Sequence, residues 1–428
     1  MRCEAVLTVS RAVRRAIIDA VTSQPSGMPS AHHPSGSPPD ARRRIERLLT
    51  GHPLVDGHND LPWEARAQVS YDLSRLELST SLRTTNTDLP RLRSGLVGAQ
   101  FWSVFVPSNL PGDTAVTATL EQVDAVHAIV ARYPDQLGIA RTADELEAVF
   151  GSGRVASLLG AEGGQSIGCS LGTLRMFYAL GVRYLTLTHN DNTPWADSAT
   201  DEPVHGGLSW FGVEVVREMN RLGMMVDLSH VSADTMRDGL DASRAPVIFS
   251  HSSARGVTDV ARNVPDDVLE RVRDTGGTCM VTFVPEFVNA DVADWRAEAA
   301  AAAVTAGVDP KDGAAFLAFT SSRAERHPKP PASLDDVVRH CEHVREVAGI
   351  EHVGIGGDYD GTDTYPVGLE DVSCYPRLFE ALAARGWSDA DLVAIAGGNT
   401  LRVMRDVEAV ARDLRGREGA GLARIGDR

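Results

Sequence analysis

Seven side chains of the types that bind metal ions each close or directly follow a short apolar run of this chain. They are His58, Asp60, Glu162, His189, His230, His251 and Asp358. Imidazole and carboxylate groups bind divalent cations, and such cations can activate water for hydrolysis. In a parallel α/β barrel the carboxyl ends of all strands lie at one face, where residues that are distant in the sequence can share a site. The pattern therefore indicates a metal-dependent centre.

Five of these residues can be grouped into two half-sites. The motif VDGHND places His58 and Asp60 two residues apart, so in extended backbone both project to the same side and could hold one cation. Glu162, His230 and His251 follow later apolar runs, and a carboxylate between two pairs of ligands can bridge two zinc ions about 3.5–4 Å apart. Each residue alone also suits a turn, a helix N-terminus or a satisfied polar position. Taken together, the five predict a binuclear zinc site bridged by Glu162.

Three further residues could act on a substrate. His189 could hydrogen-bond a developing oxyanion, and Arg262 could hold a carboxylate with its planar guanidinium. Asp358 closes the last apolar run and could transfer a proton, with Asp360 as a rival two residues later. The alternatives are a surface ion pair between Arg262 and the acids of the following NVPDD segment, and an ordinary turn at Asp358.

Eight apolar runs predict the strands that must position these residues. They lie at 54–56, 99–104, 155–160, 184–188, 224–228, 247–250, 278–283 and 353–356. Helical periodicity separates them, as in Leu120, Val123, Val126 and Val130. Strands that alternate with helices predict a parallel sheet covered on both faces, and eight units predict a (β/α)8 TIM-like barrel. A doubly wound open sheet is the alternative.

The 428 residues divide into four predicted parts. The expected parts are an N-terminal extension and linker (1–40), a barrel domain (41–415), a helical segment inserted in the seventh strand-to-helix connection (288–333) and a C-terminal tail (416–428). Within the extension we expect an amphipathic helix over 6–21 and a flexible linker over 24–40 that contains His32 and His33. The insertion is expected to be either a lid over the catalytic face or a surface excursion.

Composition excludes several functional classes. The net charge of −16 and the pI near 5.3 predict no nucleic-acid partner, and no run is long and apolar enough to predict a membrane span. Five cysteines without a CxxC pair predict a reducing compartment, with Cys279 as a small buried side chain. His340, His343 and His352 lie in or beside an amphipathic pattern and are expected at the surface.

The chain resembles the membrane dipeptidase (renal dipeptidase) family of amidohydrolase-like barrels. The similar segments keep the family order and are VDGHNDLPW from Val55, GAEGG from Gly160, YLTLTHNDNTPWADS from Tyr184, NRLGMMVDLSHVS from Asn220, APVIFSHSSA from Ala245, RNVPDD from Arg262 and GGDYDG from Gly356. The resemblance implies a zinc dipeptidase with two Zn²⁺ per chain, the same five ligands, and a bridging hydroxide as nucleophile. It further implies that His189 and Arg262 contact the dipeptide, that Asp358 shuttles the proton, and that a D-residue is tolerated at the carboxyl-terminal position.

Departures from the family shape the remaining expectations. Membrane-bound members carry a secretion signal and a lipid-anchor tail, whereas this chain has basic residues interrupting its first apolar stretch and ends in ARDLRGREGAGLARIGDR. We therefore expect a soluble, cytoplasmic bacterial member, with a homo-oligomer possible. Two alternatives stay open: a related amidohydrolase for N-acyl amino acids, lactones or phosphoesters, and a binding protein that keeps the fold without turnover.

Overall fold

Eight parallel strands close into a barrel in the computed structural model, which describes residues 39–427. The strands are β1 (Leu54–Asn59), β2 (Val97–Ser103), β4 (Val155–Glu162), β5 (Val182–Thr186), β6 (Met225–Asp227), β7 (Ile248–Phe249), β8 (Thr278–Val281) and β9 (Val353–Ile355). Neighbours in the chain are neighbours in the sheet, and the pairings of β9 with β1 and of β2 with β4 close the ring. The predicted (β/α)8 barrel is confirmed, and the open sheet is excluded.

One strand of the structure, β3 (Leu137–Ile139), was not among the eight strands predicted from the sequence. The three residues of β3 pair with the first half of β4, while β5 pairs with its second half. β3 therefore lies beside the closed ring and is not part of it. The segment LGI is too short, and too interrupted by its glycine, to stand out as an apolar run.

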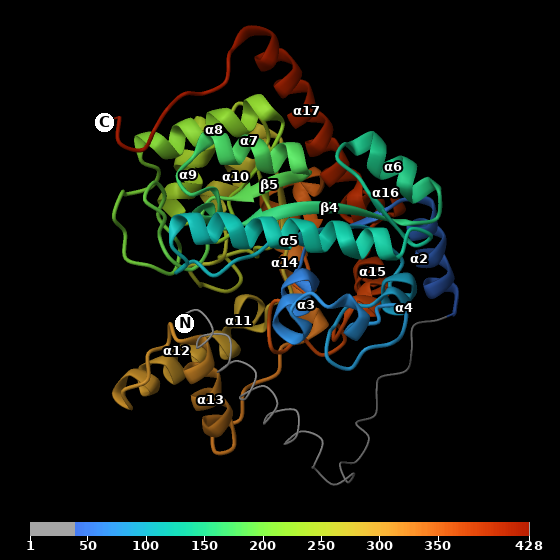
Figure 1. Ribbon diagram of the computed structural model, residues 1–428. Helices are drawn as coiled ribbons and strands as arrows, with labels where there is room; N and C mark the ends of the chain where they lie inside the picture. Colours follow the sequence, from blue (N-terminus) through green and yellow to red (C-terminus); the bar gives the residue numbers. More distant parts are fainter. Residues whose placement is uncertain (1–38, 428) are drawn as a thin grey trace.

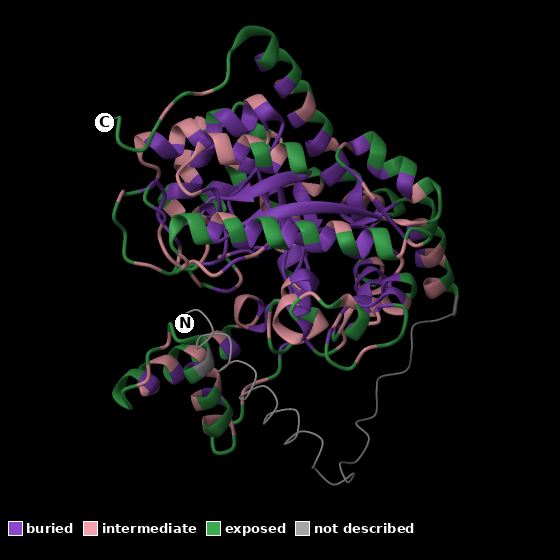
Figure 2. Ribbon diagram, viewed as in Figure 1, coloured by how far each residue is buried: buried purple, intermediate pink, exposed green. Residues whose placement is uncertain are grey.

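Helices cover the outside of the barrel (Figure 1), and Figure 2 shows buried strands beneath helices that keep one exposed face. These helices are α2 (Pro39–Gly51), α3 (Leu61–Val69), α4 (Leu89–Ser94), α5 (Gly112–Arg132), α6 (Ala143–Gly151), α7 (Leu171–Leu180), α8 (Trp210–Leu222), α9 (Ala233–Ala242), α10 (Asp266–Thr275), α14 (Leu334–Ala348), α15 (Tyr375–Ala384), α16 (Asp389–Val393) and α17 (Asn399–Arg417). The predicted apolar stripe of α5 is buried at Val123, Val126 and Val130, but Leu120 is exposed.

Local sequence signals set the ends of these helices, as α8 illustrates. The Ser209 hydroxyl accepts a hydrogen bond from the Gly212 amide at the N-cap, an interaction whose loss costs roughly 0.5–2 kcal/mol. At the other end Gly223 has a φ of 90°, a left-handed conformation that glycine adopts without a steric penalty. Between the caps, Val215 and Met219 are fully buried against the barrel side. Similar caps begin and end several of the barrel helices and hold the intervening loops at the barrel rim.

The insertion after β8 forms three helices, α11 (Pro285–Val288), α12 (Ala290–Thr305) and α13 (Gly313–Ala324). Figure 1 shows α12 and α13 standing apart from the barrel helices. They share a small apolar cluster of their own, formed by Ala299, Ala303 and Phe316. At the turn between them, Lys311 Nζ lies 2.9 Å from an Asp201 oxygen and 3.3 Å from an Asp191 oxygen. The turn between α12 and α13 thus contacts the loop that follows β5.

Two histidines contradict the expectation that they lie at the surface. His340 on α14 is fully buried, where its Nδ1 accepts a hydrogen bond from the Ala254 amide and its Nε2 lies 3.2 Å from the Val288 carbonyl oxygen. His352 is also buried, with Nδ1 2.7 Å from the Gly277 carbonyl oxygen. Main-chain groups of neighbouring segments satisfy both rings, which the helical pattern alone does not reveal. His343 is partly exposed and lies 2.8 Å from an Asp266 carboxylate oxygen.

The cysteines, the N-terminal segment and the helix lengths can be compared with the predictions. Cys279 is fully buried on β8, as predicted, and the four cysteines of the described residues are free thiols. The predicted helix over 6–21, most of the linker and both linker histidines, His32 and His33, lie outside the described residues; α2 begins at Pro39. Within residues 39–427, no helix combines the length and the apolar character that crossing a lipid bilayer requires.

Candidate metal centre

All seven predicted metal-binding and proton-transfer side chains gather at the carboxyl ends of the barrel strands. His58 lies on β1 and Glu162 is the last residue of β4, while the others follow the ends of β1, β5, β6, β7 and β9. Three overlapping groups have ligand atoms within 4.8 Å of one another: His58, Glu162 and His251; Glu162, His189 and His230; His58, Asp60 and Asp358. Barrel closure brings together residues up to 300 positions apart in the chain.

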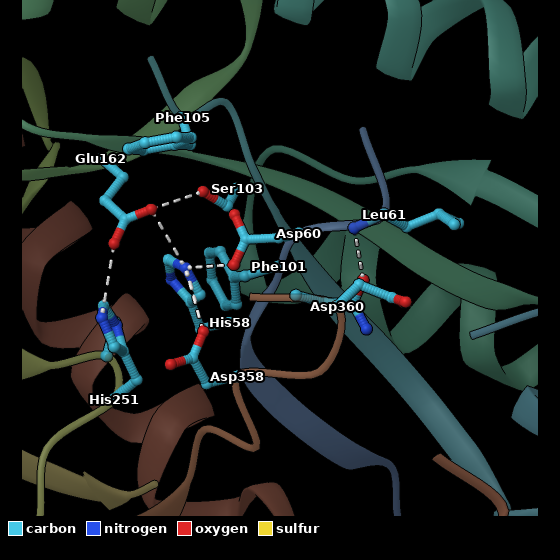
Figure 3. Close-up of polar contacts among 12 residues, drawn as sticks. His58, Asp60, Leu61, Phe101, Ser103, Phe105, Glu162, His251, Asp358 and Asp360 are labelled. Atoms are coloured by element: carbon cyan, nitrogen blue, oxygen red, sulfur yellow. Dashed lines mark hydrogen bonds and ion pairs between the residues drawn. The ribbon is translucent and has the colours of Figure 1, made fainter. Parts of the chain in front are cut away.

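Glu162 belongs to two of the three groups, and His58 links the third group to it. Figure 3 shows the contacts of Glu162 with His58 and His251. Glu162 Oε2 lies 3.3 Å from His58 Nε2 and accepts a hydrogen bond of 3.0 Å from the Ser103 hydroxyl. Its Oε1 lies 3.0 Å from His230 Nε2 and 3.4 Å from His251 Nε2. One oxygen of the carboxylate therefore faces His58 and the other faces His230 and His251, an arrangement that would allow Glu162 to bridge two metal ions.

The first set includes Asp60, whose Oδ2 lies 3.3 Å from His58 Nε2. The approach of the 358–361 loop to this pair depends on Gly361, because a Cβ there would lie 2.4 Å from Asp60 Oδ2 and 2.3 Å from Asp358 Oδ1. Any other residue would displace one of the two carboxylates. Gly361 is a requirement of the site that the sequence did not single out.

The donor atoms fit divalent cations. Although His58 Nε2 is surrounded by carboxylate oxygens, it has no hydrogen-bond partner among the described residues, and neither does the buried Oδ1 of Asp60. His230 Nε2 and His251 Nε2 lie only 2.9 Å apart. Buried polar atoms normally have partners, and nitrogen and oxygen donors that converge in this way are the ligands that zinc prefers. His58, Asp60, Glu162, His230 and His251 could hold two such ions.

The charge states of the cluster support this fit. Burial alone would raise the pKa of Glu162, but His58, His230 and His251 outweigh it and hold that pKa well below its ordinary value. Burial lowers the pKa of His230 and His251 well below the usual histidine range. The site therefore presents an ionised Glu162 carboxylate and neutral imidazoles at His230 and His251, the forms that bind metal ions. His58 differs: burial would lower its pKa, but Tyr184, Glu162 and Asp60 outweigh burial and raise that pKa well above the usual histidine range, so a cation bound there must displace a proton.

His189 lies at the edge of the cluster, with Nε2 3.9 Å from Glu162 Oε1. Its ring packs against Phe105, at 4.8 Å between centroids, and against His230, at 4.5 Å. Burial lowers the pKa of His189, so its imidazole is neutral near pH 7 and can donate a hydrogen bond without carrying a charge. The aromatic contact with Phe105 fixes the ring plane and was not foreseen from the sequence.

Arg262 is buried, with only 3% of its surface exposed, and the surface ion pair is excluded. Its guanidinium donates long hydrogen bonds to Ser252 Oγ (3.3 Å) and to the His251 carbonyl oxygen (3.4 Å) and lies over the ring of Phe287. No carboxylate of the described residues lies within 4 Å of it. Burial lowers the pKa of Arg262 to about 10, so the group remains a cation at pH 7. It can accept an anionic partner.

Asp358 and Asp360 both follow β9, but only Asp358 faces the cluster. Asp358 Oδ1 lies 4.0 Å from His58 Nε2, whereas Asp360 Oδ1 accepts a hydrogen bond from the Asn86 amide. Burial raises the pKa of Asp358 well above the usual aspartate range. Asp358, Asp360 and His230 all have positive φ values, of 58°, 68° and 68°, a strained conformation for residues other than glycine that is concentrated at functional sites.

Comparison with known proteins identifies the family. A sequence model described as membrane dipeptidase (Peptidase family M19) matches residues 42–418. The chain is 42% identical over 379 residues to Dipeptidase 3 of Rattus norvegicus. This alignment covers 87% of the present chain and 69% of the relative. Dipeptidase 3 of Macaca fascicularis is also 42% identical, over 381 residues, covering 88% and 69%.

Solved structures share the fold. The probable dipeptidase PvdM from Pseudomonas aeruginosa superimposes with a TM-score of 0.78 at 24% identity, over 88% of this chain and all of that one. A metallopeptidase from Rhodobacter sphaeroides, liganded with a phosphinate mimic of the dipeptide L-Ala-D-Ala, gives a TM-score of 0.68 at 23% identity, over 83% and 99%. A dipeptidase of family M19 gives 0.68 at 25% identity, over 83% and 98%.

Replacing Glu162 tests whether its carboxylate would bridge two bound metal ions. In Glu162→Ala the bound metal per chain should fall, because both half-sites lose a ligand. Metal content after reconstitution can be measured by inductively coupled plasma mass spectrometry. The matched control is Glu218→Ala, which removes an equally buried glutamate that pairs with Arg175 and Arg221 on the outer helices. An unchanged metal count in Glu162→Ala would contradict the bridging role.

Proposed function

Because this chain belongs to the membrane dipeptidase family, Peptidase family M19, we propose that it is a binuclear zinc dipeptidase that hydrolyses dipeptides with a free carboxyl terminus. The observation that carries the proposal is the Glu162 carboxylate, whose two oxygens face two sets of ligands within one buried cluster. Beside that cluster lies a buried cation, Arg262, which has no carboxylate of residues 39–427 within 4 Å. Metal ligands and a guanidinium without an ion pair in this part of the chain together suit a small substrate that carries its own carboxylate.

Two zinc ions would be held in half-sites that share Glu162. His58 and Asp60 would complete one half-site, and His230 and His251 the other. When bound, the two ions would supply an activated water and positive charge for the carbonyl oxygen of the peptide bond. The chain's task is to present unprotonated ligands at fixed positions, which the low pKa values of Glu162, His230 and His251 allow.

Arg262 would orient the dipeptide by its terminal carboxylate. A guanidinium offers two parallel N–H donors to a carboxylate, and Arg262 has an Nε without a hydrogen-bond partner among the described residues. Its contact with the Phe287 ring keeps the planar group in one orientation. A longer peptide would have no carboxylate at this distance from the scissile bond, so this contact favours dipeptides.

His189 and Asp358 would act on the reacting groups. The neutral imidazole of His189 is placed to donate a hydrogen bond to the oxygen on which negative charge develops. Asp358 would take a proton from the attacking water and return it to the departing amine. Its position 4.0 Å from His58 Nε2, on a strained loop, keeps the carboxylate beside the ligands but outside their closest contacts.

A carboxyl-terminal D-residue should be accepted. The proposed grip on that residue is through its carboxylate, and inverting the α-carbon exchanges the hydrogen and the side chain without removing the carboxylate. A metallopeptidase that shares this fold has been solved with a phosphinate mimic of L-Ala-D-Ala. We propose that the present chain accepts a D-residue at the carboxyl-terminal position of its dipeptide.

A dipeptide panel tests the substrate class. Zinc-reconstituted protein should cleave L,L and L,D dipeptides and leave their carboxyl-terminal amides nearly intact. Arg262→Ala should lower kcat/KM on free dipeptides by roughly 30-fold to several thousand-fold, the equivalent of about 2–5 kcal/mol for one partner of a buried charge pair. Bound metal should not change.

The control for Arg262→Ala is Arg255→Ala, which removes another guanidinium from the same loop. The Arg255 guanidinium donates a hydrogen bond to the Ala261 carbonyl oxygen. Equal cleavage of dipeptides and amides would move the substrate to N-acyl amino acids, lactones or phosphoesters. Inert L,D dipeptides would refute the stereochemical proposal alone.

The proton-transfer role is tested by Asp358→Asn. The amide keeps the shape of the side chain but cannot take up a proton, so kcat should fall by about 10²–10⁴-fold while zinc content stays the same. Asp360→Asn, which alters the neighbouring acid that faces Asn86, should retain most of the activity. If the Asp360 variant lost more activity than the Asp358 variant, the assignment would have to be reversed.

We also propose that the 288–333 insertion serves as a lid. It leaves the barrel after β8, and its turn contacts the loop after β5 that also carries His189. In that loop Asp191 accepts a hydrogen bond from the Ser108 hydroxyl and also forms an ion pair with Lys311. The insertion therefore connects the loops after β8, β5 and β2 around the mouth. Because Lys311 is 59% exposed, the contact is weak enough to open.

Reversing the charge at the turn tests the lid. In Lys311→Glu, repulsion from Asp191 and Asp201 should detach the turn, so hydrogen exchange should accelerate at 306–313 and kcat/KM should change with unaltered zinc content. Lys311→Arg keeps the charge and should behave like the wild type. Faster exchange without any kinetic change would show that the insertion is a surface excursion.

A further inference from the structure

Two of the histidines that would bind metal are held from behind by buried hydroxyl groups. Each imidazole has one nitrogen toward the centre, Nε2, and one away from it, Nδ1. His58 Nδ1 lies 2.9 Å from the Tyr184 hydroxyl, and His251 Nδ1 lies 2.8 Å from the Ser250 hydroxyl. His230 differs, because its buried Nδ1 has no hydrogen-bond partner among the described residues.

In the neutral form of His58, the form that binds a metal ion, the Tyr184 contact determines which ring nitrogen carries the proton. The Tyr184 hydroxyl also lies 3.2 Å from the Gly57 carbonyl oxygen, which can only accept. The hydroxyl hydrogen is therefore used there, and the same oxygen must accept from His58 Nδ1–H. The lone pair of His58 is then on Nε2, where it faces Asp60 and Glu162.

The barrel provides space for this tyrosine. Tyr184 on β5 is fully buried and pairs in register with Gly160 on β4. A Cβ on Gly160 would lie 1.9 Å from the Tyr184 ring, so only glycine lets the ring lie across β4. The first glycine of the GAEGG motif thus has a structural reason: it allows a side chain from the next strand to reach His58 on β1.

The second contact follows the same logic through one more residue. The Ser250 hydroxyl donates a 2.6 Å hydrogen bond to Asp227 Oδ2, so it must accept from His251 Nδ1–H. Asp227, fully buried at the end of β6, also accepts from the Thr186 hydroxyl and from the amides of Ser229 and Ser250. A carboxylate held by four donors thereby fixes the serine, and the serine fixes His251.

We propose that Tyr184 is a positioning residue for the half-site of His58 and Asp60, and that Ser250 with Asp227 positions the half-site of His230 and His251. The inference rests on the proposed two-metal centre, but it concerns the affinity for metal ions and not the substrate. Partners behind a metal-bound histidine fix its tautomer and ring plane, and their removal costs about 10–100-fold in metal affinity. Each hydroxyl should therefore affect mainly one of the two ions.

Zinc affinity of the metal-free protein, measured by competition with a chromophoric chelator, tests the proposal. Tyr184→Phe keeps the ring and removes only the hydroxyl; it should weaken one site by roughly 10–100-fold. Ser250→Ala should weaken the other site by a similar factor. Tyr359→Phe and Ser157→Ala remove buried hydroxyls of the barrel that touch no proposed ligand and should leave both affinities unchanged. Thermal unfolding of each metal-free variant checks that it folds.

The assignment of each hydroxyl to one half-site can be tested in Asp60→Ala, which should retain only the other site. In that background, Ser250→Ala should weaken the remaining zinc and Tyr184→Phe should not. If wild-type protein binds two zinc ions and neither variant changes their affinities, the positioning inference fails while the proposed function stands. If wild-type protein binds no zinc, both fail. If Tyr184→Phe weakens the site retained in Asp60→Ala, the assignment to half-sites is wrong.

Discussion

The Glu162 carboxylate is the group on which the rest of the site depends. A buried charge is costly unless it is paired and hydrogen-bonded, and Glu162 is only 4% exposed. Ser103 from β2, His58 from β1 and the histidines that follow β6 and β7 all approach its two oxygens. Strands from most of the barrel circumference must therefore end at the same height, and a closed parallel barrel meets that condition because all its strands point the same way.

Close approach of these groups requires departures from ordinary backbone and side-chain geometry. Gly160 leaves space for the Tyr184 ring, and Gly361 lets one loop pass beside two carboxylates. His230 and Asp358 have left-handed backbone angles that cost energy in residues other than glycine. The side chains around them are buried, and a rigid surrounding structure can hold such strain. Among the described residues, seven other than glycine have positive φ values, and three of them, His230, Asp358 and Asp360, lie at or beside the proposed site.

The substrate end of the site is linked to the insertion through the main chain. Asn263, next to Arg262, donates from its side-chain amide to the carbonyl oxygens of Thr258 and Phe287. Buried His340 on α14 accepts from the Ala254 amide and faces the Val288 carbonyl oxygen. The loop that carries Arg262 is thus tied to α11, at the start of the insertion, and Phe287 of α11 covers the guanidinium. A shift of α11 would therefore also displace Arg262, the residue proposed to hold the carboxylate of the substrate.

The sequence by itself determined the strand order, the barrel and the residue types at the strand ends, because periodicity and the HxD and GAEGG motifs are local signals. The seven residues that it singled out do converge. It missed β3, whose three residues depend on pairing with β4, and it misplaced His340 and His352, whose burial depends on loops far along the chain. Only the tertiary structure decided that Asp358 and not Asp360 faces the cluster, and that Tyr184 and Ser250 lie behind the imidazoles. It also decided that Arg262 is buried, with no carboxylate of the described residues within 4 Å. These are contacts between distant segments, and no local pattern in the sequence encodes which side chain will meet which across a closed barrel.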